Sequence, residues 1–236
     1  MNPIADIASG DWVRETRIGT WFLGTWMWRR HVLPGTIADL GTLLEGAPDL
    51  GRVLDAGCGQ GYAFPLLDRH FRPRHLLGID IDPDLVERGG AAAAGCACPA
   101  AIRVGDVTAL DLPDASVDTV FCHQSFHHLA RQDAAAREFY RVLAPGGRLL
   151  FTESCRSFIF SWWVRLFFRH PMAAQKTADE YIALLRAAGF AIRPGDAIRP
   201  YPPWARTDFG LLEALGCAAP ETRPVPLVCV VARKPG

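Results

Sequence analysis

The most informative segment of this chain is Arg52-Val53-Leu54-Asp55-Ala56-Gly57-Cys58-Gly59-Gln60-Gly61-Tyr62. A short apolar run, typical of a buried strand, leads into glycines at alternate positions, with Asp55 just before them. Such glycines let the backbone turn sharply and leave a floor without Cβ atoms, on which a ligand can lie against the main chain. Dinucleotide-binding loops have the spacing G-x-G-x-x-G, whereas this loop is G-x-G-x-G. The carboxylate of Asp55 would repel a phosphate and attract a cation, such as an ammonium or a sulfonium.

Composition and charge exclude several classes of protein. The 236 residues are 50% hydrophobic, 21% charged and formally neutral, which is typical of a globular enzyme and leaves no basic field for nucleic acid. No apolar run reaches the roughly 20 residues of a membrane-spanning helix. The cysteines lack zinc-type spacing, and only Cys96 and Cys98 lie close together in sequence, so no metal is predicted. With no signal peptide, a reducing cytoplasmic location is expected.

Strands and helices alternate along the chain. Apolar strands are predicted at 53–56, 75–80, 101–104, 117–122, 148–152, near 190–193 and at 227–232. Helices are predicted at 12–32 and 36–46, separated by Pro34-Gly35, and at 62–70, 83–94, 131–143, 177–188 and near 207–215. Because the strands are almost continuously apolar, they indicate a parallel sheet that helices cover on both faces.

Four ordered motifs within residues 50–155 resemble those of class I S-adenosylmethionine-dependent methyltransferases, in particular the small-molecule type 11 branch. They are the strand and glycine loop at 53–61, Gly78-Ile79-Asp80-Ile81-Asp82-Pro83, Gly105-Asp106-Val107, and 141–150 with its Pro145-Gly146-Gly147 turn. The resemblance implies an α/β fold: a Rossmann-like, doubly wound, mostly parallel sheet of seven strands, the last antiparallel, with helices on both faces and an aromatic-rich lid. It divides the chain into an N-terminal helical lid or cap, 1–48, and a cofactor-binding methyltransferase domain, 49–236, with a substrate-covering insertion around 155–176.

The resemblance also implies S-adenosylmethionine as cofactor and names the residues that hold it. Asp55, Gly57, Cys58, Gly59 and Gly61 would lie at the methionine part, Asp80 and Ile81 at the ribose, and Asp106 and Val107 at the adenine. A carboxylate such as Asp80, at the end of the second strand, can accept both ribose hydroxyls. Asp82 suits the N-cap of the next helix, with Pro83 in its first turn. Two structural alternatives stay open, a plain tight turn for the glycine loop and an Asx-turn for Asp106.

Residues 122–129 follow the fourth strand and should border the reacting methyl group. The resemblance places His123 beside the methionine part of the cofactor. Methylases of nucleic-acid bases and protein amides carry Asn/Asp-Pro-Pro-Tyr here, and this chain has His123-Gln124-Ser125-Phe126, which argues against those substrates. His127 and His123 are the candidate catalytic residues, with His127 as a possible general base. The alternative is that His127 and His128 only position the sheet edge and the following helix.

Aromatic residues are concentrated outside the shared motifs, in segments 11–33, 155–176 and 198–210. The candidate lining residues of an apolar acceptor pocket are Trp12, Trp26, Trp162 and Trp204. The prediction is therefore methyl transfer to a small hydrophobic or aromatic acceptor. Three alternatives remain: aromatic clusters that only pack the lid, a lipid- or quinone-directed enzyme at a membrane surface, and a non-catalytic S-adenosylmethionine-binding protein. The predicted partner is a small molecule rather than nucleic acid, and peripheral membrane contact is not the favoured interpretation.

Overall fold

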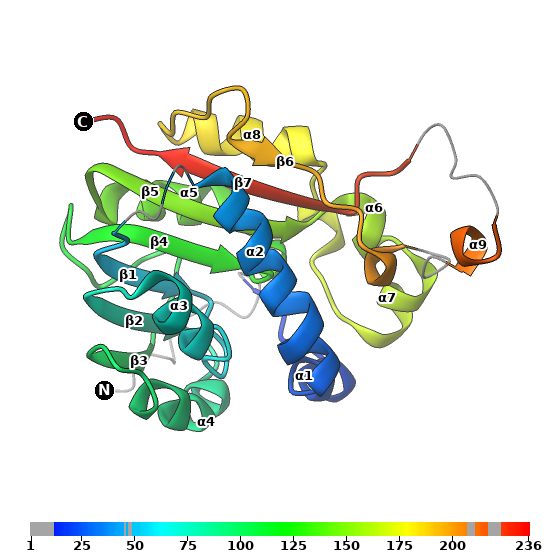
Figure 1. Cartoon of the computed structure of the whole chain (residues 1–236), viewed down its shortest axis with the longest axis horizontal. Helices are drawn as coiled ribbons and strands as arrows, with labels where there is room; N and C mark the ends of the chain where they lie inside the picture. Colours follow the sequence, from blue (N-terminus) through cyan, green and yellow to red (C-terminus); the bar gives the residue numbers. More distant parts are fainter. Residues whose placement is uncertain (1–11, 45, 47–48, 207–210, 217–222) are drawn as a thin grey trace.

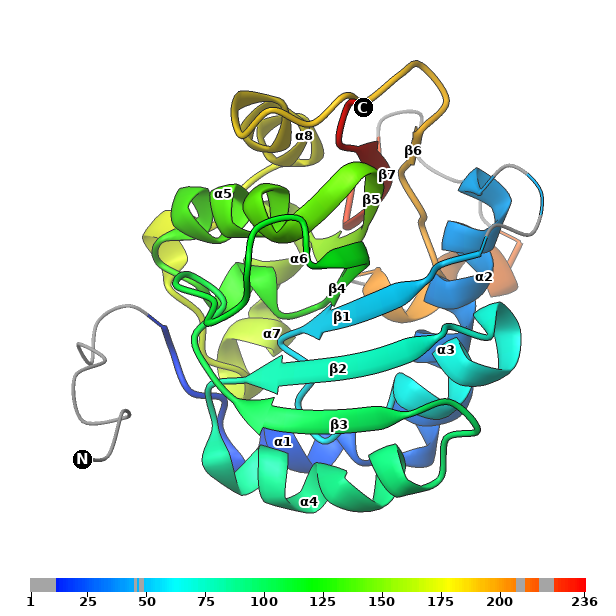
Figure 2. The ribbon, with the colours of Figure 1, turned by 90° about the vertical axis from the view of Figure 1, so that its left-hand side faces the viewer.

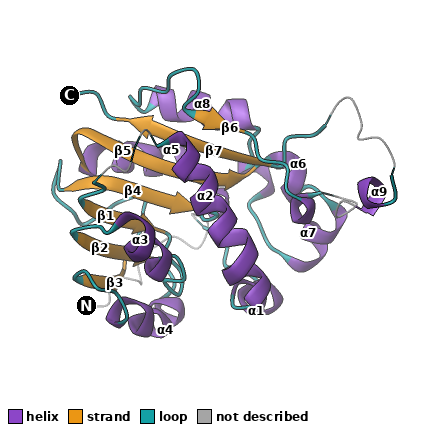
Figure 3. Cartoon of the chain, viewed as in Figure 1, coloured by secondary structure: helices purple, strands orange, loops and turns teal. Residues whose placement is uncertain are grey.

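The computed structural model describes residues 12–44, 46, 49–206, 211–216 and 223–236, and seven strands in this part of the chain form one sheet (Figure 3). Their order across the sheet is β3-β2-β1-β4-β5-β7-β6. The strands are β1 Arg52–Ala56, β2 His75–Asp80, β3 Ala100–Val104, β4 Val117–His123, β5 Leu143–Ser154, β6 Ala197–Ile198 and β7 Leu227–Arg233. Only β7 runs antiparallel to its neighbours β5 and β6, which confirms the predicted doubly wound sheet with an antiparallel last strand.

Helices cover both faces of the sheet (Figure 2). The helices are α1 Arg17–Leu23, α2 Leu33–Leu43, α3 Phe64–Phe71, α4 Pro83–Ala94, α5 Gln132–Val142, α6 Arg156–Ile159, α7 Trp162–Phe167, α8 Ala178–Ala187 and α9 Leu211–Ala214. Shorter helical turns are the π-helical η2 Trp28–Val32 and the 3-10 turns η3 Phe126–His128, η4 Met172–Ala174 and η5 Pro203–Ala205. One apolar core lies between the sheet and α2 and α3, and the other lies between the sheet and α5 and α8. No helix in the described part of the chain has the length and apolarity needed to cross a bilayer.

The start of α4 illustrates how local sequence sets an element. Asp82 lies in extended backbone, and its carboxylate accepts a hydrogen bond from the N–H of Asp84, while Pro83 occupies the first turn. Both features satisfy or remove N–H groups that have no partner at a helix start. The predicted bounds 83–94 are confirmed.

Four predicted features differ from the structure. The helix predicted at 12–32 is not continuous: residues 12–16 are not helical, and α1 and η2 are separate. Pro34-Gly35 does not separate two helices, because α2 continues directly from η2; Pro34 has no N–H to donate, and the chain widens into a π-helical turn just before it. The segment 190–193 is no strand; only Ala191 bridges to Arg233, and the edge strand is β6. Pro145-Gly146-Gly147 lies inside the longer β5, at an irregularity in its pairing with β4. Residues 207–210 of the predicted helix at 207–215 lie outside the described residues.

The fold brings the carboxyl ends of β1, β2 and β4 to one edge of the sheet, where α1 and α7 stand over them (Figure 1). The strand order reverses between β1 and β4, and ligands of doubly wound sheets bind at such a point. Helix α2 is different from a detached cap, because Leu33, Ile37 and Leu40 are buried in the core with β1 and β7. The domain boundary after residue 48 stays a prediction.

Candidate active site

The glycine loop forms a backbone floor at the end of β1. Gly57 and Gly59 have φ angles of +76° and +53°, in the left-handed region that glycine adopts without strain. A Cβ on Gly57 would lie 2.4 Å from the side chain of Ser125, whereas a Cβ on Gly59 would meet nothing within 4 Å. Gly61 instead packs against Ile102. The loop therefore exposes main chain to open space at Gly59 and is closely packed on either side of it.

Two carboxylates lie beside this floor. Asp55 is 2% exposed, and its Oδ2 has no hydrogen-bond partner in the described part of the chain. Burial, together with the nearby charge of Asp80, raises the pKa of Asp55 to about 8. Asp80 accepts hydrogen bonds from the backbone N–H of Gly59 (2.7 Å) and of Asp82 (2.9 Å), and its burial raises its pKa. A buried carboxylate oxygen without a partner favours a cationic ligand.

A cavity, here called the loop cavity, extends from the glycine loop along the carboxyl ends of β2 and β3. Its predicted lining residues are Gly57, Gly59, Asp80, Ile81, Asp106 and Val107. Asp55, Cys58 and His123 line a smaller adjoining hollow on the other side of the loop. The structure thus brings every predicted cofactor residue except Gly61 to these two spaces, because the carboxyl ends of parallel strands meet at one edge.

The chain before α1 forms a further wall of the loop cavity. Arg14 donates hydrogen bonds to both carboxylate oxygens of Asp82, at 2.8 and 2.9 Å, and Asp82 at the same time caps α4. This confirms the structural role predicted for Asp82. Oδ1 of Asp106 accepts hydrogen bonds from the N–H and the hydroxyl of Thr108, both at 2.8 Å, so the Asx-turn is present although Asp106 also lines the cavity.

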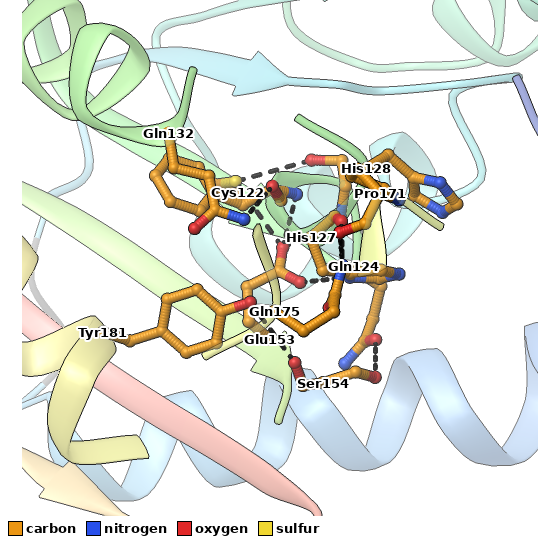
Figure 4. A network of polar contacts seen from close by, with 12 residues as sticks. Cys122, Gln124, His127, His128, Gln132, Glu153, Ser154, Pro171, Gln175 and Tyr181 are labelled. Atoms are coloured by element: carbon orange, nitrogen blue, oxygen red, sulfur yellow. Dashed lines mark hydrogen bonds and ion pairs between the residues drawn. The ribbon is translucent and has the colours of Figure 1, made fainter. Parts of the chain in front are cut away.

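A buried acid–imidazole pair lies next to this site (Figure 4). Nδ1 of His127 lies 2.5 Å from Oε2 of Glu153, a side chain that is completely buried. The other oxygen of Glu153 accepts hydrogen bonds from the backbone N–H groups of Ser125 (2.9 Å) and Phe126 (2.8 Å). Because the carboxylate accepts at Nδ1, that nitrogen carries the proton and Nε2 of His127 is the basic one.

Two more imidazoles lie against His127. One ring nitrogen from each of His127, His128 and His170 lies within 4.8 Å of the other two. Burial lowers the pKa of His128 and brings that of His170 to about 3, so both rings are neutral at ordinary pH. Nδ1 of His128 is buried without a hydrogen-bond partner, and Nε2 lies 3.8 Å from a carboxylate oxygen of Glu15. Three imidazoles form a donor set that suits zinc or a similar ion; the absence of a metal stays a prediction.

A second space, here called the aromatic cavity, lies under α1 and α7. Its apolar lining residues are Phe22, Leu23, Met27, Trp28, Phe158, Ile159, Trp163, Val164, Phe168 and Trp204. Its polar lining residues are Glu15, Gln124, His127, His128, Ser154 and His170. Of the predicted lining residues, Trp204 lies here, and Trp12 lies instead at the loop cavity, where its backbone bridges to Leu129.

The other two predicted lining tryptophans face away from both cavities. Trp26 and Trp162 are 65% and 67% exposed and line neither space, whereas Trp28 and Trp163 line the aromatic cavity. Successive residues of a helix point about 100° apart, so a shift of one or two positions moves a side chain from one face to the other. The prediction identified the right segments and the wrong members of each pair.

The loop cavity and the aromatic cavity share one wall, formed by Glu15, Leu23, Gln124 and His128. Gln124 has a φ of +53°, which is costly for a residue with a Cβ and is often associated with functional sites. The hydroxyl of Ser154 donates to Oε1 of Gln124 at 2.5 Å, while Nε2 of Gln124 is buried without a hydrogen-bond partner in the described residues. Gln124, Glu15 and His170 received no role from the sequence; the available signal was that Gln124 directly follows the end of a strand.

His123 is held on the other side of the loop. Its Nε2 lies 3.2 Å from the hydroxyl of Thr36, and its ring stacks on Phe121 with centroids 5.9 Å apart. Burial lowers the pKa of His123 to about 3. His123 lines the hollow with Asp55 and does not line the aromatic cavity, so His127 is the better placed of the two catalytic candidates.

The residues of the loop cavity and of the adjoining hollow together fit S-adenosylmethionine. Asp55 offers an unpartnered carboxylate oxygen for a cationic group, and the floor at Gly59 has no side chain to obstruct the methionine part. Asp80 and Asp106 provide acceptors suited to hydroxyl and amino groups, and Ile81 supplies apolar surface. These carboxylates and the open backbone floor all lie at one edge of the sheet.

Comparison with known proteins agrees with this geometry. Residues 54–151 match the model of a family described as a methyltransferase domain. The chain is 38% identical over 120 residues to a malonyl-[acyl-carrier protein] O-methyltransferase of Methylococcus capsulatus, covering 47% of this chain and 42% of that protein. It is 32% identical over 106 residues to phosphoethanolamine N-methyltransferase 1 of Arabidopsis thaliana (45% and 21%), and 33% identical over 123 residues to a fatty-acid O-methyltransferase of Mycolicibacterium smegmatis (51% and 43%).

The chain thus spans less than half the length of these relatives. Over a longer stretch its fold resembles a solved S-adenosylmethionine-dependent methyltransferase of Mesorhizobium loti, with a TM-score of 0.62, 20% identity, and coverage of 89% of this chain and 98% of that one. The order of the motifs and the family match lead to the same conclusion. Residues 54–151 are similar to a methyltransferase domain, and the fold resembles that of a solved S-adenosylmethionine-dependent methyltransferase.

Proposed function

We propose that this protein transfers a methyl group from S-adenosylmethionine, bound in the loop cavity, to a small acceptor bound in the aromatic cavity. The observation that carries the proposal is the wall that the two cavities share. Two ligands that both contact Glu15, Leu23, Gln124 and His128 would lie next to each other. Methyl transfer is an in-line displacement, so alignment of the two ligands supplies much of the catalysis.

The cofactor, when bound, supplies an electrophilic methyl group on a sulfonium. The chain's own contribution begins with Asp55, Asp80 and Asp106, which hold it in one orientation. Nε2 of His127 accepts the proton that the acceptor loses, and Glu153 stabilises the resulting imidazolium through Nδ1. The apolar walls exclude water from the reacting atoms.

The lining of the aromatic cavity favours an apolar acceptor. Ten of its sixteen lining residues are aromatic or aliphatic, and no lysine or arginine is among them. A phosphate-bearing acceptor would need such a cation, because an unpaired phosphate is costly to bury. The supported class is therefore a hydrophobic or aromatic molecule whose one polar group, a hydroxyl, carboxyl or amine, meets the imidazoles and Gln124.

A non-catalytic S-adenosylmethionine-binding protein is the alternative. The buried Glu153–His127 pair argues against it, because a protein that only binds the cofactor has no use for a polarised base beside a second cavity. Turnover decides between the two, since cofactor binding is common to both.

Two measurements test the proposal. Calorimetry with S-adenosylhomocysteine should show one site, and Asp80→Ala should weaken binding at least tenfold, since a charged bidentate contact is worth roughly 1.5–3 kcal/mol. Release of S-adenosylhomocysteine should then be screened with aliphatic and aromatic acids, phenols and amines. His127→Gln should lower turnover and leave cofactor affinity unchanged, whereas His75→Gln, at an exposed position on β2, should change neither. Binding of NADH in place of S-adenosylhomocysteine would refute the proposal, and cofactor binding without turnover on any class would favour the non-catalytic alternative.

A further inference from the structure

The exposed large apolar side chains of this protein are concentrated in one region. Twelve such residues occur in the described part of the chain, and nine of them lie in the two segments 18–27 and 160–172 that contribute to the aromatic cavity. They are Ile18, Trp21, Trp26, Met27, Phe160, Trp162, Leu166, Phe167 and Met172. We call the first eight of these residues the lid face. Contiguous exposed apolar surface rimmed by polar residues marks a binding surface.

The helices of the lid face are apolar on both sides. In α7, Trp163 and Val164 line the aromatic cavity, while Trp162 and Leu166 are 67% and 66% exposed. In α1, Phe22 and Leu23 line the cavity, and Trp21 on the outer side is 70% exposed. A surface helix of a globular protein normally turns a polar side to water. These two helices therefore expose large apolar side chains, with Arg17 and Arg165 as their exposed charged residues.

The two parts of the lid face lie side by side. The hydroxyl of Thr16, which caps α1, donates a hydrogen bond to the backbone carbonyl of Phe167 at 2.6 Å. The rings of Phe22 and Phe168 meet edge to face with centroids 5.8 Å apart. Figure 1 shows α1 and α7 projecting together beyond the edge of the sheet. Residues that lie far apart in sequence thus form one outer surface.

The segments that carry the lid face hold positive charges and no negative ones. Residues 16–38 and 154–178 together hold seven lysines and arginines and no aspartate or glutamate, so the remainder of this formally neutral chain carries a charge of −7. Arg17, Arg30 and Arg165 are exposed and form no ion pair with any residue that the structure describes. Positive charge beside exposed tryptophan suits the interface of an anionic bilayer, where rings sit at headgroup depth and arginines meet lipid phosphates.

We propose that the lid face docks this protein on the surface of an anionic membrane. Trp21, Trp26, Trp162 and Leu166 enter the headgroup layer, and the exposed arginines contact its phosphates. The acidic remainder of the chain is then repelled from the surface, which orients the molecule with the aromatic cavity toward the lipid. Membrane binding does not depend on methyl transfer. This orientation would let an apolar acceptor enter the aromatic cavity from the bilayer, and that part of the inference rests on the proposed function.

Vesicle co-sedimentation tests this inference with the full chain. The probes are vesicles of phosphatidylcholine alone and vesicles with about one third phosphatidylglycerol. The first variant, Trp162→Ser with Leu166→Ser, removes outer apolar groups that line neither cavity; the second, Arg30→Glu with Arg165→Glu, reverses charge. The matched controls are Val104→Ser and Arg103→Glu, an exposed apolar and an exposed basic residue of β3. S-adenosylhomocysteine affinity of every variant is measured in parallel to show that the fold and the loop cavity are intact.

The wild-type protein should bind the anionic vesicles, and each lid variant should lower the partition at least tenfold while the controls do not change it. Binding should also weaken with added salt. The inference is overturned by a wild-type protein that sediments with neither vesicle, or by lid variants that bind as the wild type does. A concentration-dependent dimer in ultracentrifugation, lost in the Trp162→Ser variant and without vesicle binding, would assign the face to a second copy and equally overturn it. If the wild-type protein bound the vesicles and did not bind S-adenosylhomocysteine, the proposed function would be contradicted and the membrane inference would stand.

Discussion

Replacing Asp55 by asparagine should remove a loss of folding stability that the wild-type protein shows as pH rises. In the folded protein burial and the charge of Asp80 raise the pKa of Asp55 from 3.8 to about 8. Between about pH 4 and pH 8 the folded chain therefore keeps a proton that the unfolded chain has released. Stability consequently falls as pH rises through this window. Asp55→Asn removes the titrating group and with it this loss.

The size of the effect follows from the two pKa values. Each pKa unit is worth about 1.4 kcal/mol. From pH 5 to pH 8, wild-type protein should lose about 4 kcal/mol of unfolding free energy relative to Asp55→Asn. The stability of the wild type relative to the asparagine variant should therefore be lower at pH 8 than at pH 5. Urea unfolding at several pH values measures it.

Cofactor binding should respond to the same group with the opposite sign. With a pKa of about 8, Asp55 is about 1% ionised at pH 6 and half ionised at pH 8 by the titration relation. A ligand ammonium requires the ionised form, so the affinity for S-adenosylhomocysteine should rise at least tenfold over this range in the wild type and stay level in Asp55→Asn. The matched control is Asp111→Asn, at an exposed carboxylate. Equal pH slopes of stability in wild type and Asp55→Asn would refute the assigned charge state, and equal slopes of affinity would refute the contact.

Three further changes probe the loop, the base and the acceptor cavity. Gly57→Ala should destabilise the fold by at least about 2 kcal/mol in urea unfolding, because φ is +76° and the new Cβ would lie 2.4 Å from Ser125; an unchanged midpoint would contradict the packing. Glu153→Gln should lower kcat about a hundredfold with S-adenosylhomocysteine affinity unchanged, because the polarisation of His127 is lost; full activity would remove the pair from the mechanism. Trp163→Ala should raise the acceptor KM about tenfold, by loss of buried apolar surface, whereas the exposed neighbour Trp162 tolerates alanine in solution assays with soluble acceptors; equal effects at both positions would contradict the assigned faces.

The loop cavity was largely predictable from the sequence because its residues lie at the ends of consecutive strands. Glycine spacing, the carboxylate after β2 and the capping role of Asp82 each depend on a few neighbouring residues. Parallel pairing then brings these strand ends together regardless of the details of packing. Gly61 is the exception, since the same spacing serves packing against Ile102.

The aromatic cavity was less predictable for two physical reasons. Helices α6 and α7 have four and six residues, less than two turns each, so no periodicity separates Trp162 from Trp163. His170 reaches His127 only through tertiary packing across 43 positions of the chain. Gln124 shows its unusual backbone only in the folded structure. None of these features produces a local pattern in the amino-acid sequence from which it could be predicted.

The positions in sequence of the residues that line the aromatic cavity have a consequence for how related proteins can change their acceptor. Among the lining residues of the aromatic cavity, only Gln124, His127 and His128 belong to the matched family segment 54–151. All others come from the flanking segments, from Glu15 through Trp28 and from Ser154 through Trp204. Changes of acceptor can therefore accumulate in the flanks, while the strand ends that line the loop cavity stay constant. Exchanging the flanking segments between related chains, with residues 54–151 kept unchanged, is the corresponding way to alter the acceptor by design.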